Sequence, residues 1–183
     1  MNETTLSSRT VFQGRLLRVD VLEVALDGGG TAMREIVRHP GAAVVLARAP
    51  DGRFLFVRQF RQAAGRALLE AVAGTLEPGE APEACARREL QEETSHEARE
   101  LRALGAAYPA PGYTEELLHF YYARAVPVAG GPAPDADERL ETVRLTAAEV
   151  EAAVVDGTIA DAKTLVAWLW YTRKVQPHEE WTA

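Results

Sequence analysis

Three glutamates lie within five residues of this 183-residue chain, at Glu89, Glu92 and Glu93. In a helix, residues three and four apart share one face, so these carboxylates would lie side by side. Like charges at that spacing repel one another, whereas a divalent cation would hold them together. Carboxylate oxygens suit Mg²⁺ better than zinc, so the cluster favours a magnesium site. A solvated acidic helix face is the alternative, because most Glu-rich stretches have that role.

The residues around the cluster predict the elements that position it. Pro82 suits the first turn of a helix, and residues 83–93 are mostly good helix formers. The preceding residues 77–80, Glu-Pro-Gly-Glu, are typical of a turn, and Gly74 ends an apolar run that predicts a strand. The order is therefore strand, turn and acidic helix.

The rest of the chain predicts an α/β fold, with a mixed sheet covered by helices and preceded by a small antiparallel unit. A hairpin is expected around Gly28-Gly29-Gly30, because no helix or Lys-Ser/Thr follows to make it a phosphate loop. We expect strands at 19–26, 31–37, 42–47, 54–60, 68–73, 101–108, 117–125 and 142–145. Helices are expected from a capping box at Thr146 through Val155, and over 160–174. Residues 129–137 are expected to form a mobile loop.

Composition narrows the class of protein. The chain is 47% hydrophobic and carries a net charge of −7, without a run of Lys or Arg, which argues against binding to nucleic acid. No run approaches the roughly 20 apolar residues of a membrane span, and the N-terminus lacks an apolar signal core. We therefore expect a cytoplasmic protein without a membrane or nucleic-acid partner. The single cysteine, Cys85, is expected to be a small core residue.

Other side chains that invite a chemical role are better explained by packing. The four histidines lack paired ligand spacing, which argues against zinc; they are His39, His96, His119 and His178. Trp168, Trp170 and Tyr171 are expected in the core or an interface rather than in a base-stacking platform.

The spacing of the acidic segment resembles the signature of the Nudix hydrolases. The matching positions are Gly74, Glu80, Arg88, Glu89, Leu90, Glu92 and Glu93. The chain departs from this signature at Ser95, where the family usually has Gly, and at His96, where it has an aliphatic residue. Because that Gly ends the helix in the family, we expect Ser95 to change the C-cap conformation rather than the ligand set.

Segments outside the signature resemble the branch that contains ADP-ribose pyrophosphatases and other nucleoside diphosphate sugar hydrolases. Pro111-Gly112 stands fifteen residues after His96, as a proline often does in this branch. The other similar segments are 34–42, 57–61, 69–74, with Val72 in place of the usual Pro, and 157–165.

The resemblance implies a metal site and a base. Glu89 and Glu93, assisted by Glu92 and the carbonyl of Ala73, would bind Mg²⁺ or Mn²⁺. Arg88 would orient these acids, with a purely structural ion pair as an equally good interpretation. Glu116 is expected to be the general base, with Glu115 as the alternative. For both residues, a solvated loop carboxylate without a catalytic role is the other interpretation.

The resemblance also implies contacts to the substrate. Arg61, and less directly Arg34 and Arg58, would neutralise phosphate oxygens, since guanidinium binds such oxygens bidentately. An exposed strand charge is an equal alternative for Arg34 and Arg58. Glu35 could contact a base, although a strand-face charge is the stronger interpretation.

Together these features predict an α/β/α sandwich with the Nudix fold, which hydrolyses the pyrophosphate bond of a nucleoside diphosphate sugar. ADP-ribose is the first candidate, giving a nucleoside monophosphate and a sugar phosphate. We expect an N-terminal β extension over 1–40 that supports a homodimer, a hydrolase domain over 41–176 and a tail over 177–183. The alternatives are hydrolysis of a nucleoside triphosphate or a dinucleoside polyphosphate, and a non-catalytic nucleotide-sugar sensor.

Overall fold

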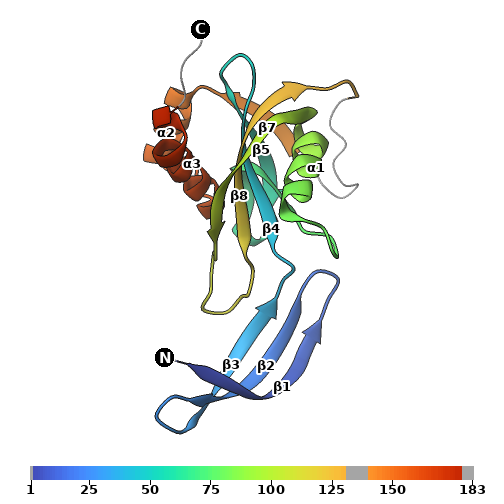
Figure 1. Cartoon of the computed structure of the whole chain (residues 1–183), viewed down its shortest axis with the longest axis vertical. Coiled ribbons are helices and arrows are strands. Elements are labelled where there is room, and N and C mark those ends of the chain that lie inside the picture. The colour runs from blue at the N-terminus through green and yellow to red at the C-terminus, as the bar shows by residue number, and fades with distance from the viewer. Residues whose placement is uncertain (1, 131–139, 179–183) are drawn as a thin grey trace. The chain divides into compact units, whose positions relative to one another are not determined.

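The computed structural model of the chain describes residues 2–130 and 140–178 (Figure 1). The expected loop at 129–137 falls outside the described residues from 131 onward, as does the tail from 179 onward. The strands are β1 (Glu3–Gln13), β2 (Arg18–Leu26), β3 (Thr31–Arg38), β4 (Ala42–Arg48), β5 (Phe54–Arg61), β6 (Arg66–Thr75), β7 (His96–Ala107), β8 (Leu118–Pro127) and β9 (Leu140–Leu145). The helices are α1 (Pro82–Thr94), α2 (Ala147–Val155) and α3 (Ala162–Lys174), with short 3₁₀ turns η1 (Gln62–Ala64) and η2 (Gln176–His178).

The chain divides into two units, one made of residues up to 41 with 108–117, and one made of 42–107 with the residues from 118 onward. The first unit is an antiparallel sheet in the order β1-β2-β3. The predicted hairpin around Gly29 is confirmed, because Ala25 pairs with Thr31 and the Leu26 amide donates to the Gly30 carbonyl. The loop at 108–117 joins this unit through a bridge between Val37 and Thr114.

Strand β1 was not among the strands predicted from the sequence. Every residue of β1 is exposed, so burial imposes no alternating pattern on its side chains. Two register shifts against β2, between Thr5 and Ser7 and between Thr10 and Phe12, break the two-residue period further. Pairing with β2, rather than a buried face, therefore defines this strand.

The second unit contains a six-stranded sheet in the order β7-β8-β4-β6-β5-β9. Strands β4 and β8 run parallel, whereas β4 and β6 are antiparallel, so the sheet is mixed as predicted. Helix α1 covers one face of the sheet, and α2 and α3 lie on the other (Figure 1). The predicted α/β/α sandwich is confirmed.

Side chains of β4 divide the core between the two faces. Val45 packs with Cys85 and Leu90 of α1, while Val44 packs with Trp168 and other residues of α3. Each of these residues is at most 4% exposed. The prediction that Cys85 and Trp168 serve as core residues is confirmed, and so is that for Tyr171, which is also buried.

Strand β7 begins at His96, five residues before the predicted start at 101. Its first half carries the charged residues Glu97, Arg99 and Glu100. These charges are typical of a strand at the edge of a sheet, and they remove the apolar alternation from which a strand is predicted. Within the described residues, no helix is long and apolar enough to cross a membrane.

Local chemistry explains where the helices begin and end. Pro82 occupies the first turn of α1, and Thr146 and Glu149 form the predicted capping box of α2. The expectation for Ser95 is wrong: the residue adopts the left-handed conformation, with φ 57° and ψ 37°, and its amide donates to the Gln91 carbonyl. Serine thus keeps the backbone geometry that favours glycine, at a cost in strain.

Candidate active site

The end of strand β6 and helix α1 approach each other at Gly74 and Glu89. A Cβ placed on Gly74 would lie 1.7 Å from Glu89 Oε1 and 1.8 Å from its Cδ, so only glycine leaves room for this carboxylate. Ala73, the predicted carbonyl ligand, is the preceding residue of the same strand. The predicted order of strand, turn and acidic helix therefore places Glu89 against the strand backbone.

The turn between β6 and α1 is closed by hydrogen bonds of its own. The Glu80 amide donates to the Glu77 carbonyl at 2.9 Å, and the Glu77 amide donates to Glu80 Oε2 at 3.0 Å. Glu80 is thereby fixed beside the first turns of α1, where it meets Arg88.

Arg88 connects three glutamates of the Nudix-like signature. Its Nε and Nη2 donate to the two oxygens of Glu80 at 2.9 and 3.0 Å, in a bidentate pair. Its Nη1 donates to Glu89 Oε1 at 2.6 Å and to Glu92 Oε2 at 3.0 Å. Arg88 therefore offsets the mutual repulsion of these acids, while its role in orienting metal ligands stays a prediction.

The charges in this network alter two pKa values. Hydrogen bonds from Arg88 lower the pKa of Glu80 to about 2, against the opposing effect of partial burial. Burial raises the pKa of the Cys85 thiol to about 12, and the charges of Glu80 and Glu89 add to the shift. Glu80 is thus a carboxylate at neutral pH, and Cys85 is a thiol that donates to the Gly74 carbonyl at 3.4 Å.

Glu93 differs from Glu92 in its burial. Glu93 is 3% exposed, whereas the Glu92 side chain is 40% exposed. The backbone carbonyl of Glu93 accepts a hydrogen bond from Thr142 of β9 at 3.0 Å, which fixes the last turn of α1. A carboxylate buried to this degree is costly unless a cation compensates it, and a metal ion is one such cation.

A second ionic cluster, centred on Glu70 of β6, was missed by the sequence analysis. Glu70 is 1% exposed, and Arg61 donates to both of its oxygens, from Nε at 2.8 Å and from Nη2 at 2.7 Å. Lys163 of α3 also donates to Glu70. The sequence signal for this cluster was Glu70 itself, a charged residue inside the apolar run 68–73. Its partner Lys163 lies 93 residues away, so the sequence did not indicate the pair.

This cluster links Arg61 to the acids of α1. The hydrogen bonds to Glu70 raise the pKa of Arg61, and the negative charges of Asp161 and Glu93 contribute to the same shift. Burial alone would raise the pKa of Glu70, but the hydrogen bonds and charges of Arg61 and Lys163 outweigh it and lower the pKa. The structure therefore brings the predicted residues Arg61 and Glu93 into electrostatic reach of each other.

The donor set fits a hard divalent cation by its chemistry. Glu89, Glu92 and Glu93 supply carboxylate oxygens from one side of α1, and the space at Gly74 admits one of them to the strand backbone. Over residues 2–130 and 140–178, however, no three His, Cys, Asp or Glu side chains gather as a formed metal site would require. Glu89 and Glu92 turn instead toward Arg88. Their role as ligands, with the Ala73 carbonyl, stays a prediction.

The two loop glutamates of the first unit have different partners. Arg38 donates to Glu115 at 2.5 Å, whereas Glu116 Oε1 lies 3.6 Å from Nδ1 of His39. Arg38 also donates to Asp20 at 2.9 Å, so it is committed to two carboxylates. Each of the two glutamates thus has a basic neighbour, and the choice of Glu116 as the general base stays a prediction.

The remaining predicted substrate contacts, Arg34, Glu35 and Arg58, lie on strands. Each of the two arginines has a glutamate of another strand beside it. Arg34 forms an ion pair with Glu3 of β1, and Arg58 Nε lies 3.8 Å from Glu141 of β9. The Arg58 side chain is 55% exposed, and Glu35 is exposed on β3. Their roles toward a substrate stay predictions.

The fold and the spacing of the acids are those of one enzyme family. The model of the NUDIX domain matches residues 37–169, so the chain belongs to the Nudix family, as the acidic segment predicted. Members of this family generally need a divalent metal ion.

Several relatives are similar over most of their length. The chain is 37% identical to the ADP-ribose pyrophosphatase of Bacillus subtilis over 91% of both chains. It is 36% identical to the methanol dehydrogenase activator of Bacillus methanolicus over 90% of both chains. Identity to the GDP-mannose pyrophosphatase of Yersinia enterocolitica is 34%, over 77% of this chain and 80% of the relative. A solved ADP compounds hydrolase has the same fold, with a TM-score of 0.81 and 23% identity over 94% of both chains.

Proposed function

We propose that the chain hydrolyses the pyrophosphate bond of a nucleoside diphosphate sugar, with ADP-ribose as its first substrate and Mg²⁺ as its metal ion. The carboxylates of α1, held against Gly74 and by Arg88, are the observation that carries the proposal. Two of the relatives are pyrophosphatases, of ADP-ribose and of GDP-mannose, which supports the wider class of nucleoside diphosphate sugars. Mn²⁺ is the expected substitute metal.

The metal ligands in this proposal are Glu89, Glu92, Glu93 and the Ala73 carbonyl. A bound divalent ion supplies charge neutralisation of the diphosphate and a lower pKa of the attacking water. The water oxygen forms a bond to one phosphorus, and the bond from that phosphorus to the bridging oxygen breaks. The products are a nucleoside monophosphate and a sugar phosphate.

Two further side chains have roles in this step. Glu116 accepts the proton that the attacking water loses, a role typically worth 10² to 10⁴ in rate. Arg61 binds a phosphate oxygen through Nη1, because its Nε and Nη2 are already committed to Glu70. Its fixed orientation favours binding of the diphosphate, since little rotamer freedom is left to lose.

The first unit is proposed to support a homodimer in the cytoplasm. Its sheet carries large apolar side chains on the surface, among them Leu6, Phe12 and Met33, which are 55%, 57% and 59% exposed. Apolar side chains in such number favour a protein interface. Arg34 and Glu35 of β3 would then serve the substrate site of the neighbouring subunit. Light scattering after size exclusion tests the dimer, and a monomer at micromolar concentration would contradict it.

The test of the reaction is a turnover panel with product identification. ADP-ribose, GDP-mannose, a nucleoside triphosphate and a dinucleoside polyphosphate are each incubated with Mg²⁺ and with EDTA. We expect metal-dependent release of a nucleoside monophosphate and a sugar phosphate. Preferred cleavage of the triphosphate or the dinucleotide would establish the alternative substrate class. Binding of ADP-ribose without turnover would establish a sensor.

The assignment of the base is tested with a matched pair of variants. Glu116→Gln is expected to lower kcat at least about 100-fold, as a general base requires. Glu115→Gln keeps a hydrogen-bond acceptor for Arg38 and is expected to lower kcat much less. The reverse order of effects would assign the base to Glu115.

A further inference from the structure

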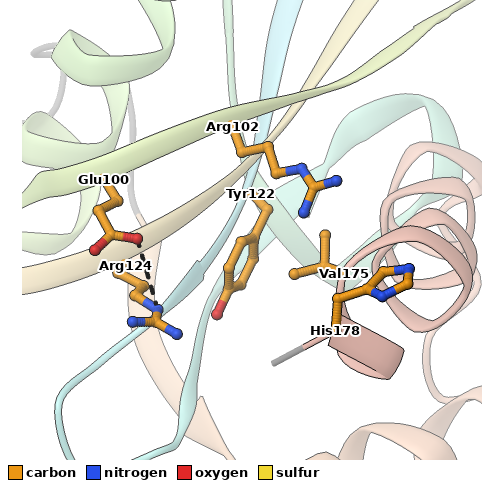
Figure 2. Close-up of a pocket in the computed structure, with 6 residues that line it drawn as sticks. All are labelled: Glu100, Arg102, Tyr122, Arg124, Val175 and His178. Atoms are coloured by element: carbon orange, nitrogen blue, oxygen red, sulfur yellow. Dashed lines mark ion pairs between the residues drawn. The ribbon is translucent and has the colours of Figure 1, made fainter. Parts of the chain in front are cut away.

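A cavity of about 150 Å³ lies on the second unit, away from the residues of the proposed active site. Its lining residues come from β7, β8 and the segment after α3, and Figure 2 shows their side chains around it. They are Glu100, Arg102, Tyr122, Arg124, Val175 and His178. At roughly 30 Å³ per water molecule, the volume holds about five waters. This is enough for a phosphate group and part of the organic group to which it is esterified.

The pairing of β7 with β8 fixes the face on which this cavity opens. Arg102 is paired with Tyr122 and Glu100 with Arg124, so the four side chains share one side of the sheet. Tyr122 packs on Tyr171 of α3, with ring centroids 5.1 Å apart. Since α1 covers the opposite face, the sheet separates the cavity from the carboxylates of α1.

The charge of the cavity is opposite in sign to that of the chain. Two arginines and one glutamate line it, whereas the whole chain carries a net charge of −7. Glu100 lies 3.8 Å from Arg124 and offsets that charge. Arg102 has no hydrogen bond or ion pair with any residue in the described part of the chain. Its guanidinium is therefore exposed to solvent at the cavity, where a ligand can reach it (Figure 2).

We propose that this cavity binds the phosphate group of a small phosphate monoester, with Arg102 as the principal ligand. A guanidinium matches phosphate oxygens in bidentate geometry, and the second arginine that lines the cavity, Arg124, adds to its positive charge. The Tyr122 ring forms the floor of the cavity, being 5% exposed, and Val175 contributes an apolar wall for the rest of the ligand. The site goes beyond the proposed hydrolysis, because it does not involve the acids of α1.

The test is isothermal titration calorimetry of the full chain in EDTA, which removes metal-dependent binding at the acids of α1. The ligands are ribose 5-phosphate, orthophosphate, ribose and acetate. We expect ribose 5-phosphate to bind more tightly than orthophosphate, and ribose and acetate to give no heat. Equal binding of the two phosphates would assign the site to inorganic phosphate instead of a monoester and would overturn the monoester assignment.

Matched variants locate the binding. Arg102→Gln is expected to raise the Kd for ribose 5-phosphate at least tenfold. Arg99→Gln, a change on the same strand at a side chain that is 68% exposed and paired with Glu97, is expected to leave it unchanged. Glu93→Gln is also expected to leave it unchanged, so failure here is distinguishable from failure of the proposed hydrolysis.

A measurement on the unaltered protein covers the case in which a variant folds poorly. Saturating ribose 5-phosphate should shift the NMR resonances of the Tyr122 ring and of the Arg102 side chain. Absence of both shifts, absence of measurable binding, or an unchanged Kd in Arg102→Gln would each overturn the proposal.

Discussion

The Glu89 carboxylate occupies the space that a side chain on Gly74 would need. An added Cβ would lie 1.7 Å from Glu89 Oε1, and 2.5 Å from its Cγ, which are distances that no pair of non-bonded atoms sustains. The contact joins strand β6 to helix α1 at the residue after Ala73. The identity of one glycine therefore determines where a predicted metal ligand lies.

Gly74→Ala should displace Glu89 and weaken metal binding. Overpacking of this kind costs about 1–3 kcal/mol in the free energy of unfolding, and a displaced ligand weakens metal affinity by roughly 10- to 100-fold. Urea unfolding and a Mg²⁺ titration of turnover measure the two effects. The double variant Gly74→Ala/Glu89→Ala tests the cause, because removal of the carboxylate should recover most of the lost stability. Simple additivity of the two changes would show that the clash is not the cause.

Arg88→Met should lower the free energy of unfolding more at neutral pH than at acid pH. Arg88 lowers the pKa of Glu80 to about 2 from an ordinary value of 4.5. A lowered pKa contributes stability above pH 4.5, and that contribution is lost as the pH falls through 4.5 toward 2. The difference in unfolding free energy between the two proteins should therefore shrink over this range.

The matched control for this prediction is Arg87→Met. Arg87 pairs with Glu83 one turn earlier on the same helix, where the side chains are 44% and 58% exposed. Exposed pairs contribute little, so this variant should show no comparable dependence on pH between 2 and 4.5. A constant difference across that range in Arg88→Met would contradict the role assigned to Arg88.

Glu70→Gln should destabilise the second unit strongly. Glu70 is almost fully buried between Arg61 and Lys163, and removal of one partner from a buried ion pair costs about 3 kcal/mol. Glu141→Gln is the control, because Glu141 is 73% exposed and 3.8 Å from Arg58, where about 0–1 kcal/mol is expected. Equal urea midpoints for the two variants would show that the Glu70 cluster contributes no more to the free energy of unfolding than the exposed pair does.

Cys85 should resist alkylation in the folded protein. Burial raises its pKa to about 12 from 9, which lowers the thiolate fraction at pH 8 about a thousandfold, and its Sγ lies under the backbone of β6. Iodoacetamide labelling followed by mass spectrometry should show reaction only after unfolding in urea. Labelling of the native protein at the rate of the unfolded chain would contradict the buried position.

The strands of the second unit were predictable where burial imposes a pattern. Strand β4 is apolar on both faces and was found within one residue of its observed bounds, because Val44 and Val45 face different helices. Strand β1 was not found, because its eleven residues are all exposed and no burial marks them. Edge and surface strands are defined by backbone pairing, which leaves little trace in side-chain types.

The candidate site was predictable where its residues are close in sequence. Glu89, Glu92 and Glu93 lie on one helix, as their spacing predicted, while their role as metal ligands stays a prediction. The cluster of Glu70 with Lys163 was not predictable, because it joins β6 to α3 across 93 residues, and no local period encodes such a pair. The error over Ser95 arose from reading glycine as the one residue for a left-handed cap, whereas serine adopts it here.

The most direct test of the proposed function is single-turnover hydrolysis of ADP-ribose by the unaltered chain and by Glu93→Gln, each with saturating Mg²⁺ and with EDTA. Glu93 is 3% exposed, so of the three acids it is the one whose charge most needs a compensating cation, and its change should matter most to metal binding. We predict release of AMP and ribose 5-phosphate by the unaltered chain with Mg²⁺ only, and a loss of at least about 100-fold in Glu93→Gln. Unchanged hydrolysis in Glu93→Gln, or hydrolysis that persists in EDTA, would contradict the metal-dependent reaction proposed for the acids of α1.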